Sequence, residues 1–415
     1  MKNNPFTSST YVSKWFSHFE KNQTEKKFSF INDISFYKHS WLPLFINSGK
    51  NLTKGVNYNL SENDNTDYKG NTYLIYDVPE FFNVKTDTNH QSLKIKKVKQ
   101  YPGFLVELNS FKDITEYMNT TFKKSSRYKL RKYKNRFEQC FDISYKMYKG
   151  EMSKEEYDFV FDHFKRLLEK RFLDKEITNN NLNLEEWNFY YDVVYPMILE
   201  EKASLQVIYD GKKPIGVTLN YFSDTVLFDA ITVFDIDYAK FHLGSITIMK
   251  LIEWSIDNKL EIFDFTKGYF DYKKRWATKE YNFEYHILYD NKSLKARTIA
   301  KSIELFFKTK QYLRDKKIND RLHKLSFLLK NNKNKPANTS STFQFKEFTE
   351  NYNEADLVKV NYNEDENHYL KNIIFDFLYL NTESLKDIEL YKIANKQQLY
   401  LISGKTSKQI VELSD

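Results

Sequence analysis

YAKFHLGSITIMKLIEWSIDNKLEIFDFTKGYFDYKKRW, residues 238–276, is the stretch of the chain whose pattern predicts a fold and a reaction site together. Apolar residues recur at helical spacing after Leu243-Gly244-Ser245, which predicts a helix that begins there. The run from Glu261 to Phe265 is short and mostly apolar, as is typical of a buried strand, and Asp264 lies near its C-terminal end. Because ligands gather beyond the carboxyl ends of strands in open sheets, we expect a site near Asp264.

Three strands are expected immediately before this stretch, at 204–209, 215–222 and 225–233. The pair Asp210-Gly211 follows the first and favours a hairpin turn, and Ser223-Asp224 separates the other two. An antiparallel meander is the simplest arrangement of such closely spaced strands. The last strand, the helix and the strand after it then form a β-α-β unit.

The start of the predicted helix lacks acidic residues until Glu253. Helix N-termini usually attract Asp or Glu, because their free N–H groups and the helix dipole favour negative charge. A free N-terminus that glycine helps to expose can receive a phosphate instead. Leu243, Gly244 and Ser245 are therefore candidates for binding the phosphates of a cofactor.

A turn and a short polar segment follow the strand. The turn is Thr266-Lys267-Gly268, and the segment is Asp271-Tyr272-Lys273-Lys274-Arg275-Trp276. A carboxylate, a phenol and several cations thus lie within a dozen residues, as general acid–base chemistry requires. In the competing interpretation, Asp264 is only a cap and the cations belong to a solvated turn.

A basic helix is predicted upstream, from Ser125 to Phe141, after a capping box at Ser110-Phe111-Lys112-Asp113. Arg127 and Arg131 lie one turn apart and can present two guanidinium groups to phosphate or carboxylate. The competing interpretation is a solvated helix face. Interleaved tyrosines also leave RNA binding open.

Composition restricts the class of protein. The chain has 415 residues, a formal net charge of +8 and one cysteine, Cys140, which excludes an internal disulfide and a cysteine-rich metal site. No metal site is expected. We find no apolar run of the ~20 residues that a membrane helix needs and no secretory signal in the first residues. A cytoplasmic protein without membrane insertion is therefore expected.

The length favours more than one domain, because single cores seldom extend beyond ~250–300 residues. We expect a mixed α/β lobe at 1–124, a domain at 125–330 that contains the basic helix and the stretch quoted above, and a linker at 331–342. Residues 343–415 are expected to form a small α+β appendage.

The run from Gly244 to Trp276 resembles the acyltransferase domain of the CelD/BcsL family, within the GCN5-related N-acetyltransferase (GNAT) superfamily. The family pattern is a glycine that opens a helix, an Asp-Phe-x-x-Gly turn, Tyr-Lys and a basic-aromatic tail. Here it is matched by Gly244, Asp264-Phe265-Thr266-Lys267-Gly268, Tyr272-Lys273 and Arg275-Trp276, and the segment Arg127 to Lys132 resembles the family's Arg-rich helix. The resemblance covers residues 104–289.

This resemblance implies an α/β (α+β) fold with the mixed central sheet of GNAT-type acyl-CoA N-acyltransferases. It also relates the chain to the Fem-type aminoacyltransferases, which pair two such lobes. The implied reaction is direct acyl transfer from acyl-CoA, acetyl-CoA in the simplest case, to an amine or hydroxyl of a small molecule, sugar or peptide. The usual Gln/Arg-x-x-Gly-x-Gly/Ala phosphate loop is replaced by residues 240–245.

On this basis Asp264 is the expected base or acceptor-orienting group, Tyr272 the acid, and Lys273 the group that stabilises the oxyanion or binds an anion. His242 and His286 are reserve bases. The expected cofactor-binding residues are Leu243, Gly244, Ser245, Lys267 and Gly268, with help from Lys240, and the expected substrate-binding residues are Arg127, Arg131, Arg275 and Trp276.

Two alternatives remain. A Fem-type transferase would take its acyl group from aminoacyl-tRNA, which the basic helix would bind. A protein of another class would bind nucleic acid or a partner without catalysis.

Overall fold

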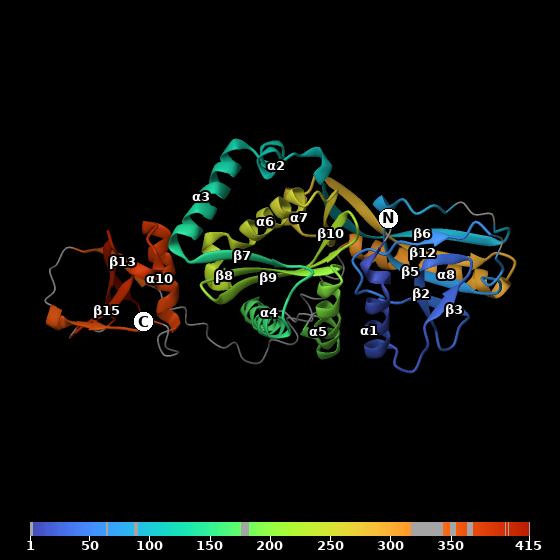
Figure 1. Ribbon diagram of the computed structural model, residues 1–415, viewed down its shortest axis with the longest axis horizontal. Helices are drawn as coiled ribbons and strands as arrows, with labels where there is room; N and C mark the ends of the chain where they lie inside the picture. Colours follow the sequence, from blue (N-terminus) through green and yellow to red (C-terminus); the bar gives the residue numbers. More distant parts are fainter. Residues whose placement is uncertain are drawn as a thin grey trace.

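One mixed sheet of twelve strands extends through most of the described chain in the computed structural model (Figure 1). The structure describes residues 3–63, 65–86, 90–175, 182–316, 343–348, 354–362, 368–394, 396 and 398–414. The strand order is β1-β2-β3-β5-β12-β6-β11-β10-β9-β8-β7, and β4 pairs with β2. The bounds are β1 (Lys26–Phe28), β2 (Ile31–Lys38), β3 (Leu44–Asn47), β4 (Asn59–Leu60), β5 (Thr72–Pro79), β6 (Leu93–Glu107), β7 (Ile143–Tyr148), β8 (Ala203–Asp210), β9 (Lys213–Phe222), β10 (Val226–Phe234), β11 (Ile262–Lys267) and β12 (Lys279–Asp290).

Two long strands, β6 and β12, join the N-terminal part of the sheet to its centre. They pair antiparallel from Lys279 opposite Leu105 to Asp290 opposite Leu93. β6 also pairs with β11, and β12 also pairs with β5. The segments 1–124 and 125–330 therefore contribute strands to one sheet, and the expected linker at 331–342 lies outside the described residues.

The predicted meander of β8, β9 and β10 is confirmed and lies toward the β7 end of the sheet. Helix α6 (Leu243–Asp257) then leads to β11, which lies parallel to β10. This parallel pairing covers only 226–228 against 262–264, and a bulge between Asp229 and Ile231 follows in β10. The two strands therefore separate just after Phe228, which leaves room for a pocket at their open ends.

Helices cover both faces of this central region (Figure 1). α6 lies on one face, where its buried Ile248, Leu251 and Ile252 share a core with residues of β6 and β11. α4 (Lys154–Lys175) and α5 (Leu184–Leu199) lie on the other face. The apolar spacing that predicted the helix after Leu243 is thus the buried side of α6.

The predicted basic helix is α3 (Lys124–Cys140), and α2 (Ile114–Thr121) precedes it. The predicted capping box at Ser110 to Asp113 is wrong by three residues. Asp113 is itself the N-cap, since its Oδ1 accepts a hydrogen bond from Glu116 N–H at 2.8 Å, and Glu116 accepts one from Lys112 N–H at 2.9 Å. A capping box places the acid three residues after the cap, and Glu116 occupies that position, although it accepts from Lys112 N–H and not from the N–H of Asp113.

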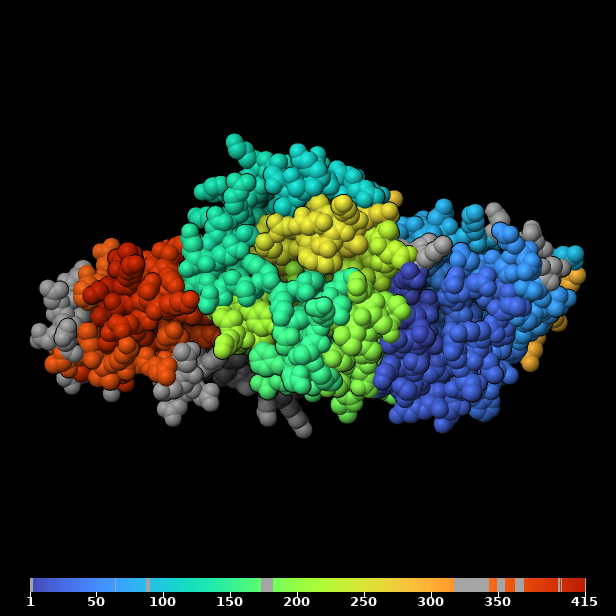
Figure 2. All heavy atoms as spheres, viewed as in Figure 1, coloured from blue at the N-terminus to red at the C-terminus, as the bar shows by residue number. Residues whose placement is uncertain are grey.

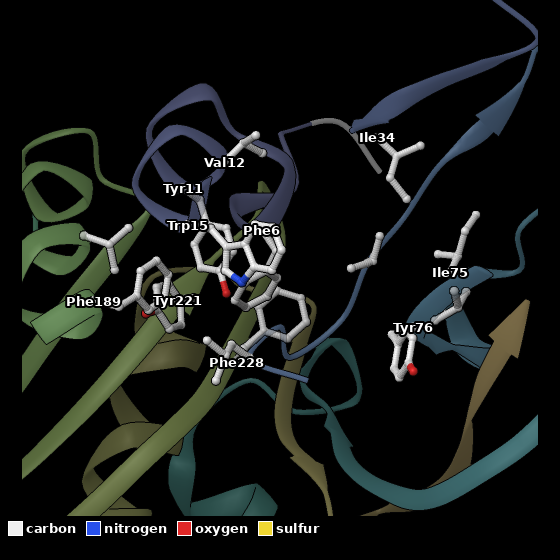
Figure 3. Close-up of a cluster of buried hydrophobic side chains, with 14 of the residues drawn as sticks. Phe6, Tyr11, Val12, Trp15, Ile34, Ile75, Tyr76, Phe189, Tyr221 and Phe228 are labelled. Atoms are coloured by element: carbon white, nitrogen blue, oxygen red, sulfur yellow. The ribbon is translucent and has the colours of Figure 1, made fainter. Parts of the chain in front are cut away.

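The N-terminal helix α1 (Ser9–Phe19) lies where the N-terminal and central parts meet. Figure 3 shows its aromatic side chains packed with residues of α5, β9 and β10. The Phe6 ring lies 5.0 Å from that of Tyr221 and 5.5 Å from that of Phe228, and the Tyr11 ring lies 5.4 Å from that of Phe189. One continuous core therefore spans both parts.

The C-terminal appendage is a five-stranded sheet with one described helix, α10 (His368–Asn381), as the predicted α+β character requires. The strand order is β13-β17-β16-β15-β14, with bounds β13 (Phe343–Glu347), β14 (Leu357–Lys359), β15 (Glu389–Ile393), β16 (Leu399–Ser403) and β17 (Lys408–Leu413). In Figure 2 the appendage, in orange and red, lies against the α3 end of the central part. Phe375 packs between Phe141 and Tyr238, with ring centroids 4.9 Å from each.

Two further helices complete the described chain, α7 (Asp271–Trp276) and α8 (Leu294–Asp315). Each described helix is too short or too polar to span a bilayer.

Candidate active site

The first turn of α6 presents backbone N–H groups, and no acidic side chain lies in it. His242, with φ of +59°, precedes the helix, and its carbonyl accepts hydrogen bonds from Ser245 and Ile246 N–H at 2.9 and 3.2 Å. The N–H groups of Leu243 and Gly244 precede these bonds and have no partner within the helix. This positive end of the helix dipole is suited to an anion.

Gly244 lets the end of β10 approach this turn closely. A Cβ atom built on Gly244 would lie 2.8 Å from Cε1 of Phe234, which is closer than packed carbon atoms allow. Any other residue would displace the Phe234 ring. Glycine therefore fixes where α6 begins relative to β10.

A pocket of about 280 Å³ opens beside this turn and is lined by residues of α4, β10, α6 and α7. It brings together Gly244, Ser245, Tyr272, Arg275 and Trp276, five of the residues that the sequence predicts for the site. Its remaining lining residues are Arg171, Asp229, Thr232, Phe234, Ala239, His242 and Ile248. Trp276 is largely committed to the core, where its ring lies 4.8 Å from that of Phe122.

Asp229 is the carboxylate that lines this pocket. It lies at the β10 bulge and is buried, and its Oδ1 accepts a hydrogen bond from the Thr232 hydroxyl at 2.8 Å. Burial raises the pKa of Asp229, and the charges of Lys273 and Lys54 oppose the rise. A carboxylate with a raised pKa is suited to accept a proton near neutral pH.

Tyr272 lies at the edge of the same pocket, on α7, with 39% of its surface exposed. Within the described chain its hydroxyl makes no hydrogen bond. Burial raises the pKa of Tyr272, and the charge of Asp229 raises it further. The phenol therefore stays protonated at neutral pH and is free to donate.

Asp264 is fully buried beside the pocket and does not line it. The Tyr281 hydroxyl lies 2.7 and 2.8 Å from its two oxygens, and Thr266 N–H donates to Oδ1 at 2.8 Å. Burial raises the pKa of Asp264 to about 7, although these hydrogen bonds lower it. Tyr281 reaches Asp264 across Gly103, where a Cβ atom would lie 2.2 Å from Cζ of the tyrosine ring.

Lys273 is buried below the β11–α7 turn. Its Nζ donates to the carbonyl oxygens of Phe265, Thr266 and Lys267 at 2.6, 3.4 and 3.1 Å. Burial lowers the pKa of Lys273 to about 8. Its ammonium therefore holds the turn in place, including Thr266 with its φ of +61°.

Lys267 and Gly268 lie outside the pocket lining. The Nζ of Lys267 pairs with Oδ1 of Asp77 at 2.5 Å, so the turn is tied to β5 of the N-terminal part. Gly268 has φ of +135°, a conformation that favours glycine. Lys240 pairs with Asp376 of α10 at 2.6 Å, so the structure places it in the contact with the appendage.

Arg127 and Arg131 line a separate pocket of about 210 Å³ among α2, α3 and α6. The Nη1 of Arg127 donates hydrogen bonds to the carbonyl oxygens of Phe122 and Asn119, at 2.6 and 3.4 Å. These bonds lie at the C-terminal end of α2. The structure therefore does not bring these two arginines to the pocket at Gly244.

The two histidines differ in place. His286 is buried on β12, with its ring 2.7 Å from the Tyr58 hydroxyl and 2.9 Å from Glu284. His242 lines the pocket and stacks on Tyr133, with ring centroids 3.7 Å apart.

Sequence reasoning missed Asp229, Arg171 and Tyr281. Asp229 left a signal, because it is a carboxylate inside the apolar strand 226–234. Arg171 and Tyr281 carry no local signal, since only the tertiary structure brings them to the pocket and to Asp264.

Comparison with known protein families finds one match, and it covers most of the residues that line the pocket. Residues 124–274 match the family model described as Acetyltransferase (GNAT) domain. No curated protein matches the chain.

Solved structures with a similar arrangement include FemX, at 11% identity and TM-score 0.45 over 69% of this chain and 92% of that chain. A conserved protein of unknown function from Bacteroides thetaiotaomicron is similar at 10% identity and TM-score 0.44, over 69% of this chain and 93% of that chain. L-PGS from Bacillus licheniformis is similar at 13% identity and TM-score 0.42, over 72% of this chain and 91% of that chain. The family match and the mixed sheet together indicate a GNAT-like fold for residues 124–274.

Proposed function

We propose that this protein transfers an acyl group, acetyl in the simplest case, from acyl-CoA to an amine or hydroxyl of a small molecule, a sugar or a peptide. We place it with acyltransferases of the CelD/BcsL type. The observation that carries the proposal is the pocket where the free start of α6, Asp229 and Tyr272 meet. The GNAT family match over the same residues supports it.

The pocket fits a phosphate-bearing thioester donor. The N–H groups of Leu243 and Gly244 and the cations Arg171 and Arg275 offer positive charge at one wall. Phe234 and Ile248 offer an apolar wall for the chain that links the phosphates to the thioester. When bound, the donor supplies the activated acyl group.

In the proposed reaction Asp229 acts as the base and Tyr272 as the acid. Asp229 takes the proton from the attacking amine or hydroxyl, whose nitrogen or oxygen forms the new bond to the acyl carbon. The carbon–sulfur bond breaks, and Tyr272 gives its proton to the departing sulfur. No covalent bond to the enzyme is needed.

Asp264 and Lys273 are buried near Asp229 and Tyr272 and position them in the proposed arrangement. The sequence predicts Asp264 as base or acceptor-orienting group, but its oxygens already accept hydrogen bonds from Tyr281 and Thr266. Lys273 was the expected oxyanion group, but its ammonium is bound to three carbonyl oxygens. We therefore give both a positioning role and place Asp229 first as base.

Donor binding tests the proposal directly. Acetyl-CoA at a hundred times its Kd should stabilise the wild-type fold by about 2.7 kcal/mol in a thermal or denaturant melt. Ser245→Glu should abolish this stabilisation, because it puts a negative charge at the start of α6 beside the donor phosphates. Ser245 already carries a Cβ atom, and an acid in the first turn favours the helix, so the variant should fold.

Ser302→Glu on the exposed side of α8 is the matched control and should keep the wild-type response. If neither acetyl-CoA nor longer acyl-CoA donors stabilise the wild type, acyl-CoA is not the donor.

A second candidate donor is aminoacyl-tRNA. The observation that favours it is the exposed side of α3, where Lys123, Lys124, Lys129, Arg131 and Lys132 have no ion pair within the described residues. Such a surface suits a phosphate backbone. Salt-sensitive tRNA binding that is lost in Arg131→Glu would favour this donor, and an absence of both donor and tRNA binding would favour a non-catalytic partner-binding protein.

A further inference from the structure

A cluster of five cations lies where the N-terminal part meets the β11–α7 turn. We call it the basic cluster, and it consists of Lys50, Lys54, Lys267, Lys310 and Arg314. Lys50 and Lys54 lie in the loop after β3, Lys267 ends β11, and Lys310 and Arg314 lie near the end of α8. Three segments that are distant in sequence thus bring like charges together.

Direct contacts fix these segments to one another. Lys267 pairs with Oδ1 of Asp77 at 2.5 Å, and the hydroxyl of Thr53 donates to Oδ2 of the same carboxylate at 2.9 Å. The loop that carries Lys54 is therefore held beside the end of β11.

The end of α8 is attached to the same turn through aromatic rings. The Arg314 guanidinium lies 3.5 Å from the centroid of the Tyr101 ring, and that ring lies 5.7 Å from the ring of Tyr269, just after Gly268. The Nζ of Lys50 lies 5.6 Å from the centroid of the Tyr76 ring. Tyr76 is the residue before Asp77. Two of the cations thus lie over aromatic rings, Arg314 over Tyr101 and Lys50 over the buried Tyr76.

Carboxylates compensate part of the charge of the basic cluster within the described chain. Asp77 pairs with Lys267, and Asp315 accepts a hydrogen bond from Gln311 at 2.7 Å. The carboxylates of Asp77, Asp229 and Glu186 face Lys54. Its ammonium makes neither a hydrogen bond nor an ion pair with any described residue. Burial, followed by the charge of Lys267, lowers the pKa of Lys54 to about 8.

The Lys54 loop also touches the strand that carries the proposed base. A Cβ atom built on Gly55 would lie 3.1 Å from Cε1 of Phe228, the residue before Asp229. The charge of Lys54 acts on Asp229 as well as on Asp77. Lys54 is therefore a member of the basic cluster whose loop reaches the strand of Asp229.

We infer that the basic cluster is the subsite for an anionic group, phosphate or carboxylate, on the acceptor. The inference rests on the proposed function and narrows its substrate class to anionic acceptors. An anion held by Lys54, Lys310 and Arg314 would direct the acceptor's amine or hydroxyl toward Asp229. It would also relieve the repulsion among the five cations, since charge-assisted hydrogen bonds to such groups are among the stronger ones.

Titration with inorganic phosphate and with malonate, at equal ionic strength, tests this subsite by calorimetry. The wild type should bind at least one of the two saturably, and the preference between them separates a phosphate from a carboxylate acceptor. Lys54→Met and Lys310→Met keep the side-chain length and should each weaken binding by about tenfold. Lys301→Met, on the same helix but outside the basic cluster, should bind as the wild type does.

Acetyl-CoA titrated into the same variants separates this inference from the proposed function. Lys54→Met should keep the wild-type affinity for acetyl-CoA, because the donor lies at the α6 side. If acetyl-CoA binds but neither probe does, or if Ser245→Glu abolishes phosphate binding while Lys54→Met retains it, the subsite is overturned and the acyltransferase proposal stands. If the probes bind at Lys54 but no acyl-CoA binds, the subsite is supported and the donor assignment fails.

Discussion

Two buried carboxylates near the pocket at Gly244 differ in the groups that their oxygens contact. Both oxygens of Asp264 accept a hydrogen bond from Tyr281, whereas Asp229 is bonded through Oδ1 to Thr232 and lines the pocket. Burial raises the pKa of each. At the scale of single residues, contact with the pocket rather than pKa separates a base from a supporting residue.

Substitution separates the two assignments. Asp229→Asn should lower kcat by about 10²-fold or more, because the proton acceptor is lost. Asp264→Asn should lower kcat less than tenfold and chiefly reduce stability, because it perturbs the contact with Tyr281. Steady-state rates and denaturant melts of both variants measure this, and a hundredfold loss confined to Asp264→Asn would return the base role to Asp264.

The raised pKa of Asp264 also predicts how stability depends on pH. The folded state holds the proton up to a pKa of about 7, against an ordinary value of 3.8, so it binds more protons than the unfolded state between these values. The contribution of Asp264 to the free energy of unfolding is therefore fully present below the ordinary value and is lost as pH rises through about 7.

Denaturant melts from pH 4 to pH 8, at constant ionic strength, check this prediction. The wild type should lose more stability over that range than Asp264→Asn, which has no proton to lose. Equal slopes in the two proteins would show that Asp264 is ionised throughout.

At the scale of elements, a glycine on one strand determines where a tyrosine on the next can lie. Gly103 on β6 faces Tyr281 on β12, and the ring occupies the space that a side chain would take. This arrangement directs the Tyr281 hydroxyl to Asp264 on β11. Three adjacent strands thus share one buried hydrogen-bond unit.

Gly103→Ala should destabilise the fold by about 1–3 kcal/mol, because its Cβ atom would lie 2.2 Å from Cζ of Tyr281 and overpack the site. Gly216→Ala on β9 is the matched control, since its Cβ atom would meet nothing closer than 3.6 Å. Urea melts of the two variants check the difference. Equal stability would mean that Tyr281 can move without cost.

At the scale of the whole molecule, the appendage packs against the segment that leads into α6. Residues of α10 share a core with Phe141, Phe241 and Leu243, and Lys240 pairs with Asp376. The segment that leads into α6 is therefore held by the appendage. We expect the appendage to position this segment for donor binding.

Phe375→Ala tests that expectation. Removing this buried ring should cost about 3–5 kcal/mol of stability and weaken acetyl-CoA binding, because the contact that supports the start of α6 is loosened. Phe306→Ala, a control at an exposed position on α8, should change neither quantity. Wild-type donor affinity in folded Phe375→Ala would limit the appendage to a stabilising role.

Local pattern in the sequence determined the elements of the central domain. The meander, α6 and β11 follow from residue spacing and turn pairs, because helix and strand periods are properties of neighbouring residues. The free start of α6 was also predictable, since it depends only on which residues fill the first turn. Gly244, Ser245 and Tyr272 could therefore be selected as site candidates.

Contacts between distant residues were decided by the tertiary structure alone. Asp77 and Lys267 are 190 residues apart, and Tyr281 meets Asp264 only because β6 lies between β11 and β12. The same long-range pairing removes Lys240, Arg127 and Arg131 from the pocket and places Asp229 in it. A local window specifies the face that a residue presents, but which distant face it meets depends on how all the strands pair.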